Sequence, residues 1–320
     1  ELYLICMNPA SEKNIFFLEK SLKLLEQEDV SRLRPYLVYE REKSRFMADT
    51  PPFSGWDIHW VDPAELAARQ LLLLPGFPDI LPLDRLQDGA AHEKLSLALL
   101  GFSKTAEFLY EYLSSCVQTA GLSVTFYLLD KNTSENSAWF LKSNPGLASL
   151  ISFVPLDLEP ETPEFYDFFS DSSTKLDGLF FLGEDSSQNV RLALQLREWL
   201  EKQGRPVPFF LLGQNIWGDR LVLDACRVSC FGLTEQIYSY DVFIEEKLDA
   251  MAKAVHLYYS DFRQSSGDPD ALWKKASLYE KMSSRALALH FPWKARCAGF
   301  EIVPLQNSDP KTPSGSVFEK

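Results

Sequence analysis

The sequence has few cysteines and no long apolar run, and each shortage excludes a class of protein. Its five cysteines are odd in number and scattered over 320 residues, which argues against a disulfide framework and for a reducing compartment. Cys226 and Cys230 lie one helical turn apart, but no second Cys or His pair completes a zinc site. Because no run of about 18 apolar residues occurs, we expect no membrane-spanning helix within this chain.

Positive charge is also scarce. The 32 Lys and Arg residues stand against 45 Asp and Glu residues, which gives a net charge of −13. Such a balance argues against nucleic acid or an anionic membrane face as the main partner, and it leaves room for a local basic pocket that binds a small anion. Apolar residues are plentiful, since the hydrophobic fraction is 46% with 23 Phe, and this excludes general disorder. The length predicts two or three domains.

The first 88 residues have the pattern of a βαβ-like unit. Short apolar runs predict strands at 2–6, 34–39 and 56–61, and a 3.6-residue period predicts a helix over 12–28. A second helix is predicted after Asp62, with Asp62 as its cap and Pro63 in its first position. The loop after the first strand lacks a glycine turn, which argues against phosphate binding in this unit.

Residues 92–244 alternate apolar strands with helices. Near-continuous apolar strands of this kind predict a parallel sheet covered by helices on both faces. The predicted strands are 95–100, 124–129, 151–156, 178–182 and 207–212, with a further strand within 232–241, and the predicted helices are 105–119, 164–169 and 188–203.

A glycine turn and an acid mark a candidate nucleotide site in this second unit. Gly101 lies between the first strand and its helix, and Asp130 ends the second strand. The helix N-terminus can hold a phosphate on its free N–H groups, and the acid can hold ribose hydroxyls. Ser103 and Ala106 stand where the G-x-G-x-x-G pattern has its later glycines, and both are small. We expect Gly101→Val to abolish binding and leave the fold mostly intact. The alternative is a decayed site, with Asp130 as a cap or turn residue.

The stretch from 95 to 212 resembles the TrkA-N type nucleotide-binding domain, which regulates the conductance of potassium channels and transporters. Gly101, Asp130, the loop 183–187 and Asn189 carry this resemblance, with Asp157 where the family often has an acid. The resemblance implies a site for NAD, or for another adenine nucleotide or related second messenger. The cofactor-binding residues that it implies are Gly101, Ser103, Lys104, Thr105, Asp130, Asp157, Gly183, Glu184 and Asn189.

From Glu245 onward the pattern is helical. One apolar stripe runs from Leu248 to Tyr259, and a second helical stretch covers about 271–290. Pro292 predicts that this second helix ends near Phe291. A turn there would bring basic residues together around an anionic ligand. The alternative is a helix end at which cations favour the C-terminal dipole.

This helical segment resembles the first half of a RyR domain, the repeat named after ryanodine receptors and also found in bacterial proteins. The resemblance rests on His256 and Tyr259, on Trp273, and on the step from Ser283 to Arg285 that is followed by a His and a Lys. It implies an incomplete RyR-type domain over 245–320. The ligand-binding residues that it implies are Trp273, Ser283, Arg285, His290 and Lys294.

Together these patterns predict an α/β protein with two Rossmann-like parallel-sheet domains, 1–88 and 92–244, and a small, mostly helical RyR-type domain over 245–320. The resemblances imply a ligand-sensing cytoplasmic module of an ion channel or transporter, which binds a small nucleotide. They imply a homo-oligomer tethered to the membrane by a pore segment upstream in the same polypeptide. No nucleophile, acid–base or P-loop signature occurs, so we expect no enzyme. The alternatives are a soluble NAD(P)-dependent oxidoreductase and a scaffold whose Rossmann-like domains bind nothing and serve dimerisation.

Overall fold

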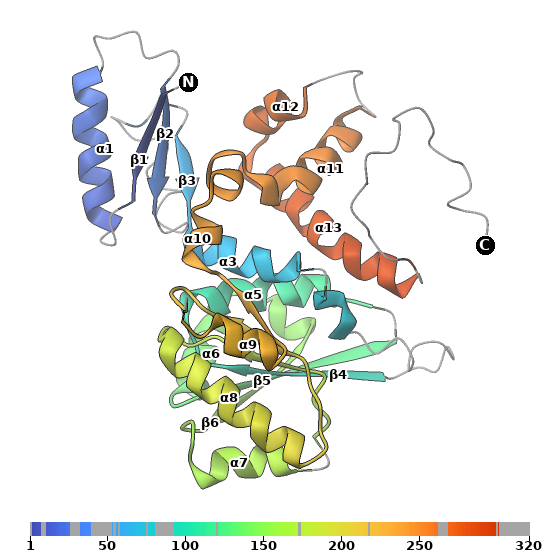
Figure 1. The fold of residues 1–320 in the computed structure, drawn as a ribbon. Coiled ribbons are helices and arrows are strands. Elements are labelled where there is room, and N and C mark those ends of the chain that lie inside the picture. Colours follow the sequence, from blue (N-terminus) through green and yellow to red (C-terminus); the bar gives the residue numbers. More distant parts are fainter. Residues whose placement is uncertain are drawn as a thin grey trace.

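Two parallel β-sheets of different size organise the chain, and helices follow them (Figure 1). This arrangement confirms the predicted α/β class with two parallel-sheet units and a helical C-terminal part. The computed structural model describes residues 2–7, 11–25, 33–39, 53, 56, 58–74, 76–80, 93–119, 121–171, 174–216, 218–261, 268–298 and 300. The predicted loop 8–10, the last residues of the helix predicted over 12–28, and residues 301–320 of the predicted third domain therefore lie outside the described residues.

The first sheet contains three parallel strands in the order β1-β2-β3. One face of the sheet packs against α1, where Leu18 and Leu22 are fully buried against Leu37. This core is small, because only six buried residues of the described chain make it up. The elements are β1 (Leu2–Cys6), α1 (Ser11–Leu25), β2 (Leu33–Val38) and β3 (His59–Val61).

Helix α3 (Pro63–Leu72) connects the two sheets. As predicted, Asp62 caps it by accepting a hydrogen bond from the Ala64 N–H at 3.0 Å, and Pro63 occupies its first turn. Its apolar face, which includes Ala68 and Leu71, is buried in the same core as the second sheet. The helix therefore follows the first sheet in sequence and packs with the second.

The second sheet contains six parallel strands in the order β6-β5-β4-β7-β8-β9. Numbered from its own first strand, this order is 3-2-1-4-5-6, the strand order of the Rossmann fold. Alternate side chains of β4 point to opposite faces: Leu97 and Leu99 pack with α3 and α5, and Ala98 and Leu100 pack with α7 and α8. The strands are β4 (Glu93–Leu100), β5 (Leu122–Asp130), β6 (Ser152–Asp157), β7 (Gly178–Phe181), β8 (Phe209–Leu212) and β9 (Val228–Phe231).

The helices of this unit include two that the sequence pattern did not predict, α6 and α9. Both are short and carry little buried apolar surface, so their periodicity is weak. The helices are α5 (Lys104–Cys116), α6 (Thr133–Ser143), α7 (Pro163–Ser170), α8 (Ser186–Lys202) and α9 (Arg220–Ala225).

The strand predicted within 232–241 is wrong. The last strand, β9, ends one residue earlier, and α10 (Thr234–Ile237) and a π-helical turn, η3 (Tyr240–Ile244), follow it. Gly232 adopts a positive φ of 69°, which ends the extended backbone at that point. This segment leads instead into a linker that contacts the first sheet, where Tyr36 OH donates to Ile244 O at 3.3 Å.

The C-terminal unit contains three helices that follow a short turn, η4 (Lys247–Asp249): α11 (Ala250–Asp261), α12 (Pro269–Lys275) and α13 (Leu278–Cys297). The stretch predicted as one helix over 271–290 is therefore two, and a capping box between Ser277 and Glu280 begins the second. The prediction that this helix ends near Phe291 is also wrong, since Pro292 lies inside α13. Trp293 is 2% exposed, and its Nε1 donates a hydrogen bond to Thr119 Oγ1 at 2.8 Å. Packing against the second sheet thus holds the last turns in place.

Candidate functional site

The carboxyl ends of β4 and β7 form the topological switch point of the large sheet. Open parallel sheets bind ligands at this point, because the connections leave neighbouring strands in opposite directions. The two strands are joined up to their ends, since the Leu182 N–H donates to Leu100 O at 2.7 Å. From here the chain continues through Gly101 to α5 on one face and through Gly183 to α8 on the other.

Gly101 is required by the close approach of these two loops. Its φ is +98°, and a Cβ atom built on it would lie 2.4 Å from Gly183 N and 2.7 Å from Gly183 Cα. Backbone cannot give way as a flexible side chain can, so any other residue must push the loops apart. The expectation that Gly101→Val spares the fold is therefore corrected: this change disturbs the turn itself and its contact with Gly183.

Aromatic side chains pack around the Gly101 turn and stabilise it. The Phe102 ring packs edge-on against Tyr110, with centroids 5.4 Å apart, and against Phe140 at 6.2 Å. Tyr110 OH donates to Gly101 O at 3.2 Å. Burial, together with the charges of Asp130 and Glu107, raises the pKa of Tyr110 far above its ordinary value. The phenol therefore stays protonated and remains a donor to the turn.

Asp130 lies at the tip of β5, beside the start of α5. Its Oδ2 accepts a hydrogen bond from the Phe102 N–H at 2.9 Å, and its Oδ1 accepts one from the Lys131 N–H at 2.6 Å. These bonds fix the carboxylate, as the turn-residue alternative predicts. A carboxylate has about four acceptor positions, so two bonds leave capacity for ribose hydroxyls. Both interpretations of Asp130 are thus compatible with one geometry.

The N-terminus of α5 supplies donors next to this carboxylate. Ser103 caps the helix, and its Oγ accepts from the Ala106 N–H at 3.2 Å. The N–H groups of Lys104 and Thr105 occupy the first turn, where a helix offers no acceptor of its own. The Lys104 ammonium pairs with Glu107 at 2.8 Å. This helix end therefore offers backbone N–H donors to a phosphate or pyrophosphate group, and the Lys104 charge is already paired.

The other implied cofactor residues take different positions. Asn189 is 5% exposed, and its Nδ2 donates to Gly183 O at 2.8 Å and to Leu212 O at 3.0 Å. It therefore holds the Gly183 loop against the end of β8. Asp157 is the register partner of Asp130 on β6. Hydrogen bonds from Ser134 lower the pKa of Asp157. Glu184, in the loop between β7 and α8, is exposed.

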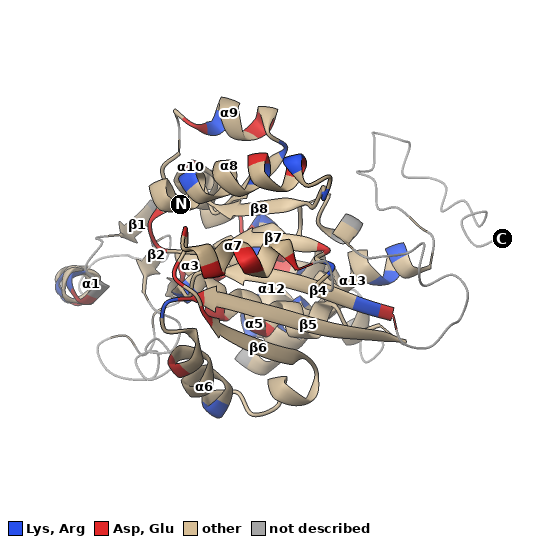
Figure 2. Ribbon diagram, turned by 90° about the horizontal axis from the view of Figure 1, so that it is seen from below, with Lys and Arg blue, Asp and Glu red and all other residues tan. Residues whose placement is uncertain are grey.

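Acidic residues therefore gather at the carboxyl edge of the large sheet, as Figure 2 shows. Asp130 and Asp157 end neighbouring strands, and Glu184 and Asp185 follow β7. Asp185 also caps α8, since its Oδ1 accepts from the Ser187 N–H at 2.9 Å. This edge favours hydroxyl and N–H groups, and it disfavours ligands with several phosphates.

A hollow lies at the opposite, amino edge of the sheet. It is a partly open cavity of about 460 Å³ between α7, the end of α8 and the loop 205–207. The Arg205 guanidinium at its wall donates to the backbone carbonyls of Phe169 at 2.5 Å and Thr174 at 2.6 Å. These bonds direct the cation into the protein, and so the cavity offers little recognition chemistry.

Arg285, which sequence reasoning placed in an anion pocket, is held by a carboxylate of the chain itself. Its Nε and Nη2 donate to the two carboxylate oxygens of Asp249 at 2.7 and 2.6 Å, and its Nη1 lies 3.7 Å from Glu65. Asp249 also pairs with Arg69. Burial alone would raise the pKa of Asp249, but the charge of Arg69 and the hydrogen bonds of Arg285 outweigh it and lower the pKa to about 2.

The remaining residues of the implied C-terminal pocket do not share these partners. Trp273 is 3% exposed and packs under Arg285, whose Cζ lies 5.6 Å from the ring centroid, so it is a core residue. Ser283 and Lys294 are exposed. Burial and the charge of Lys294 lower the pKa of His290, and a backbone hydrogen bond with Gln118 opposes them. His290 thus adjoins α5, whereas Arg285 adjoins α3.

Sequence reasoning missed the group that joins these parts, which we name the buried ion cluster: Glu65, Arg69, Tyr112, Asp249 and Arg285. It includes a hydrogen bond of 2.6 Å from Tyr112 OH to Glu65 Oε1. The members come from α3, α5, η4 and α13. Only Glu65 and Arg69 gave a signal, because they are four residues apart on a face otherwise made of Ala and Leu. The same spacing also fits an ordinary ion pair on the exposed face of a helix.

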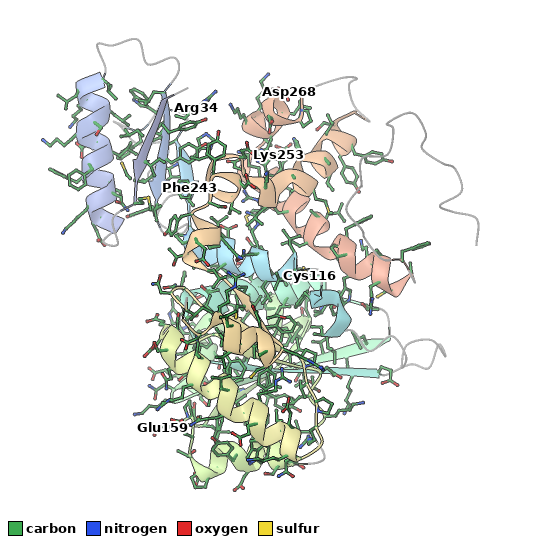
Figure 3. The ribbon with its side chains drawn as sticks, viewed as in Figure 1. Arg34, Cys116, Glu159, Phe243, Lys253 and Asp268 are labelled. Carbon is green, nitrogen blue, oxygen red and sulfur yellow. The ribbon has the colours of Figure 1, made fainter. Side chains whose placement is uncertain are left out.

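Side chains around the linker extend this contact to the first sheet (Figure 3). Phe243 of η3 lies 5.6 Å from the ring of Tyr36, which stacks on His59 at 4.5 Å. Glu246 pairs with His59 at 3.1 Å and with Lys253 of α11 at 3.2 Å. The linker thus contacts both the first sheet and the C-terminal helices.

No family model matches this chain, and no curated protein matches it. The resemblances to TrkA-N and RyR domains therefore stay predictions. Within the described part of the chain, no group of three or more His, Cys, Asp or Glu residues could hold a metal ion. None of the helices described is both long enough and apolar enough to cross a bilayer.

Proposed function

We propose that this chain is a ligand-sensing regulatory module, which binds an adenine nucleotide at the switch point of the large sheet. The observation that carries the proposal is the position of α5. Its N-terminus lies beside Asp130 at the carboxyl edge, and its side packs against α3. Thr119, three residues beyond its end, accepts the hydrogen bond of Trp293 in α13. A ligand at the N-terminus of α5 would thus be connected to the C-terminal unit through this helix and the hydrogen bond between Thr119 and Trp293.

The chemistry of the edge favours a ligand of the NAD class. A single helix N-terminus can hold a pyrophosphate, and the acceptor positions left on Asp130 can take two ribose hydroxyls. The same carboxylate repels a 2′-phosphate, so NADP fits less well. ATP places more negative charge against Asp130, Asp157 and Glu184, and we expect it to bind more weakly than NAD.

The regulatory part of the proposal rests on how the units are joined. The buried ion cluster ties α3 to η4 and α13 with ionised side chains, and the hydrogen bond from Tyr112 to Glu65 adds α5. Such contacts have preferred geometries rather than a continuous range. A ligand that shifts α5 has a different affinity for each arrangement of the C-terminal helices, and this difference is what biases an equilibrium. By its resemblance to TrkA-N and RyR domains, we propose an ion channel or transporter as the regulated partner, with membrane attachment supplied outside this chain.

Calorimetric titration with NAD, NADH, ATP, ADP and cyclic dinucleotides tests the proposal. We expect wild-type affinity for NAD or NADH between low micromolar and millimolar, as is usual for sensors. Asp130→Asn should weaken it about tenfold or more, because a hydrogen bond to a charged group is worth about 1.5–3 kcal/mol.

Asp177→Asn is the matched control. Asp177 Oδ2 accepts a backbone hydrogen bond from Ser96 at 2.9 Å, as Asp130 does from Phe102, but at the amino edge of the sheet. This variant should bind like the wild type. Absence of heat and of any thermal shift with every nucleotide would sink the proposal, and so would equal losses in the two variants.

A further inference from the structure

The outer edge of β1 carries no partner strand within the described residues. In the order β1-β2-β3, β1 pairs only with β2. An edge strand exposes backbone N–H and C=O groups that can pair with another chain, and proteins normally protect such edges with charge, proline or short length. The segment Leu2–Cys6 has neither charge nor proline, since it reads Leu-Tyr-Leu-Ile-Cys.

The large sheet shows how this protein treats edges that stay unpaired. Its outer strand β6 contains Pro155, which removes a backbone donor. Its other outer strand, β9, has only four residues. Pro155 thus makes the β6 edge a poorer template for pairing than β1, which has no proline.

Side-chain exposure agrees with this difference. Ile5 of β1 is 42% exposed and Met7, directly after the strand, is 50% exposed. Within the described residues, three strands, one covering helix and a six-residue core make a sheet that is marginal by itself. Additional strands on the β1 edge would bury these apolar groups and satisfy the backbone.

We propose that β1 pairs with β1 of a second copy of this chain, in antiparallel register about a two-fold axis. Such pairing places Tyr3 opposite Ile5 of the other copy and Leu4 opposite itself, so apolar groups meet apolar groups without any charge. It joins two three-stranded sheets into one of six strands.

The outward face of α1 is the competing self-interface. Phe16, Phe17 and Leu24 are exposed there, and charged residues of both signs lie among them: Glu12, Lys13, Glu19, Lys20 and Lys23. A two-fold contact on this face must cover these charges and the Lys23–Glu19 pair, whereas β1 carries no charge.

Sedimentation velocity over about 1–100 µM protein tests the pairing. We expect a dimer of twice the 36.5 kDa chain mass at the upper end. Ile5→Lys should weaken dimerisation about tenfold or more, because it places two ammonium groups near the axis. Leu24→Lys, the same kind of change at an exposed site on α1, should leave it unchanged. Hydrogen exchange of wild-type residues 3–5 should slow as the concentration rises, and this readout depends on no variant.

A wild-type monomer at the highest concentration would overturn the proposal. So would a dimer that Leu24→Lys disrupts and Ile5→Lys does not, since that result would place the contact on α1. Concentration-independent exchange at residues 3–5 in a confirmed dimer would exclude the β1 edge. Nucleotide binding is a separate measurement, and neither result decides the other.

Discussion

Removing the guanidinium of Arg285 separates a structural role from a ligand-binding role. In the structure this group makes two hydrogen bonds to Asp249 and lies 3.7 Å from Glu65, and the Asp249 side chain is only 5% exposed. Breaking a buried ion pair by deleting one partner costs about 3–5 kcal/mol. Asp249 keeps Arg69 as a partner in the Arg285→Ala variant. The cost therefore lies at or just below the lower end of that range, and we expect a loss of about 2–3 kcal/mol.

Differential scanning calorimetry measures this loss as a fall in Tm. An unfolding entropy of about 2.1 cal/mol/K per residue makes about 1 kcal/mol equal to about 1.5 °C for a chain of 320 residues, so Arg285→Ala should melt about 3–5 °C lower than the wild type. The control is Lys202→Ala, which breaks a 2.6 Å pair with Glu198 in which both side chains are 70% exposed. An exposed pair of this kind contributes at most about 1 kcal/mol, so the control should melt close to the wild type.

The same variant is then titrated with NADH. Because Arg285 is held by Asp249, its loss should leave the affinity of the Gly101 site within about twofold, well under the 1.4 kcal/mol that a tenfold change represents. An unchanged Tm combined with a clear loss of affinity would refute this reasoning. Arg285 would then be a ligand residue, and the buried ion cluster would not be a structural element.

Three further changes test other parts of the structure. Gly101→Ala should lower the free energy of unfolding by about 3 kcal/mol or more, because a Cβ atom there meets the Gly183 backbone at 2.4 Å. Gly204→Ala, at φ +66° with open space around it, should cost about 1 kcal/mol. Urea unfolding compares the two variants, and equal losses would contradict the close approach. The pKa of Asp249 is lowered to about 2 from 3.8, so the stability that its ionised form contributes is complete above about pH 5 and is lost as the pH falls through 4 towards 2. Asp249→Asn should flatten that part of a curve of Tm against pH. An unaltered slope would show that other carboxylates cause the loss of stability in acid. Pro292→Ala should raise Tm by a few degrees because it restores a hydrogen bond inside α13, and no change would indicate that the helix ends before this residue in solution.

The sequence pattern predicted the sheets because their strands are strongly apolar. Residues 95–100 and 124–129 are buried on both faces of a parallel sheet, so their composition alone marks them as strands. The end of the large sheet could not be predicted in the same way. Whether Gly232 continues or ends a strand depends on its packing against Leu212, 20 residues earlier in the chain.

The candidate site was predictable only where it follows the strand order. Gly101 and Asp130 come to one edge because both follow parallel strands, which the pattern indicated. The partner of Arg285 was not predictable, since Asp249 lies 36 residues away and Glu65 far earlier, in a helix assigned to another unit. Local spacing carries no information on contacts of this length.

Hydrogen–deuterium exchange of the wild-type chain with and without saturating NADH tests the central claim most directly. The account predicts slower exchange at 102–107, which covers the Gly101 turn and the first turn of α5, and at 131–134 after Asp130. A smaller change should follow in 288–296 of α13, since α5 contacts this helix through Thr119 and Trp293. Exchange that is unaltered everywhere, or altered only around 205–207 at the amino edge, would contradict it.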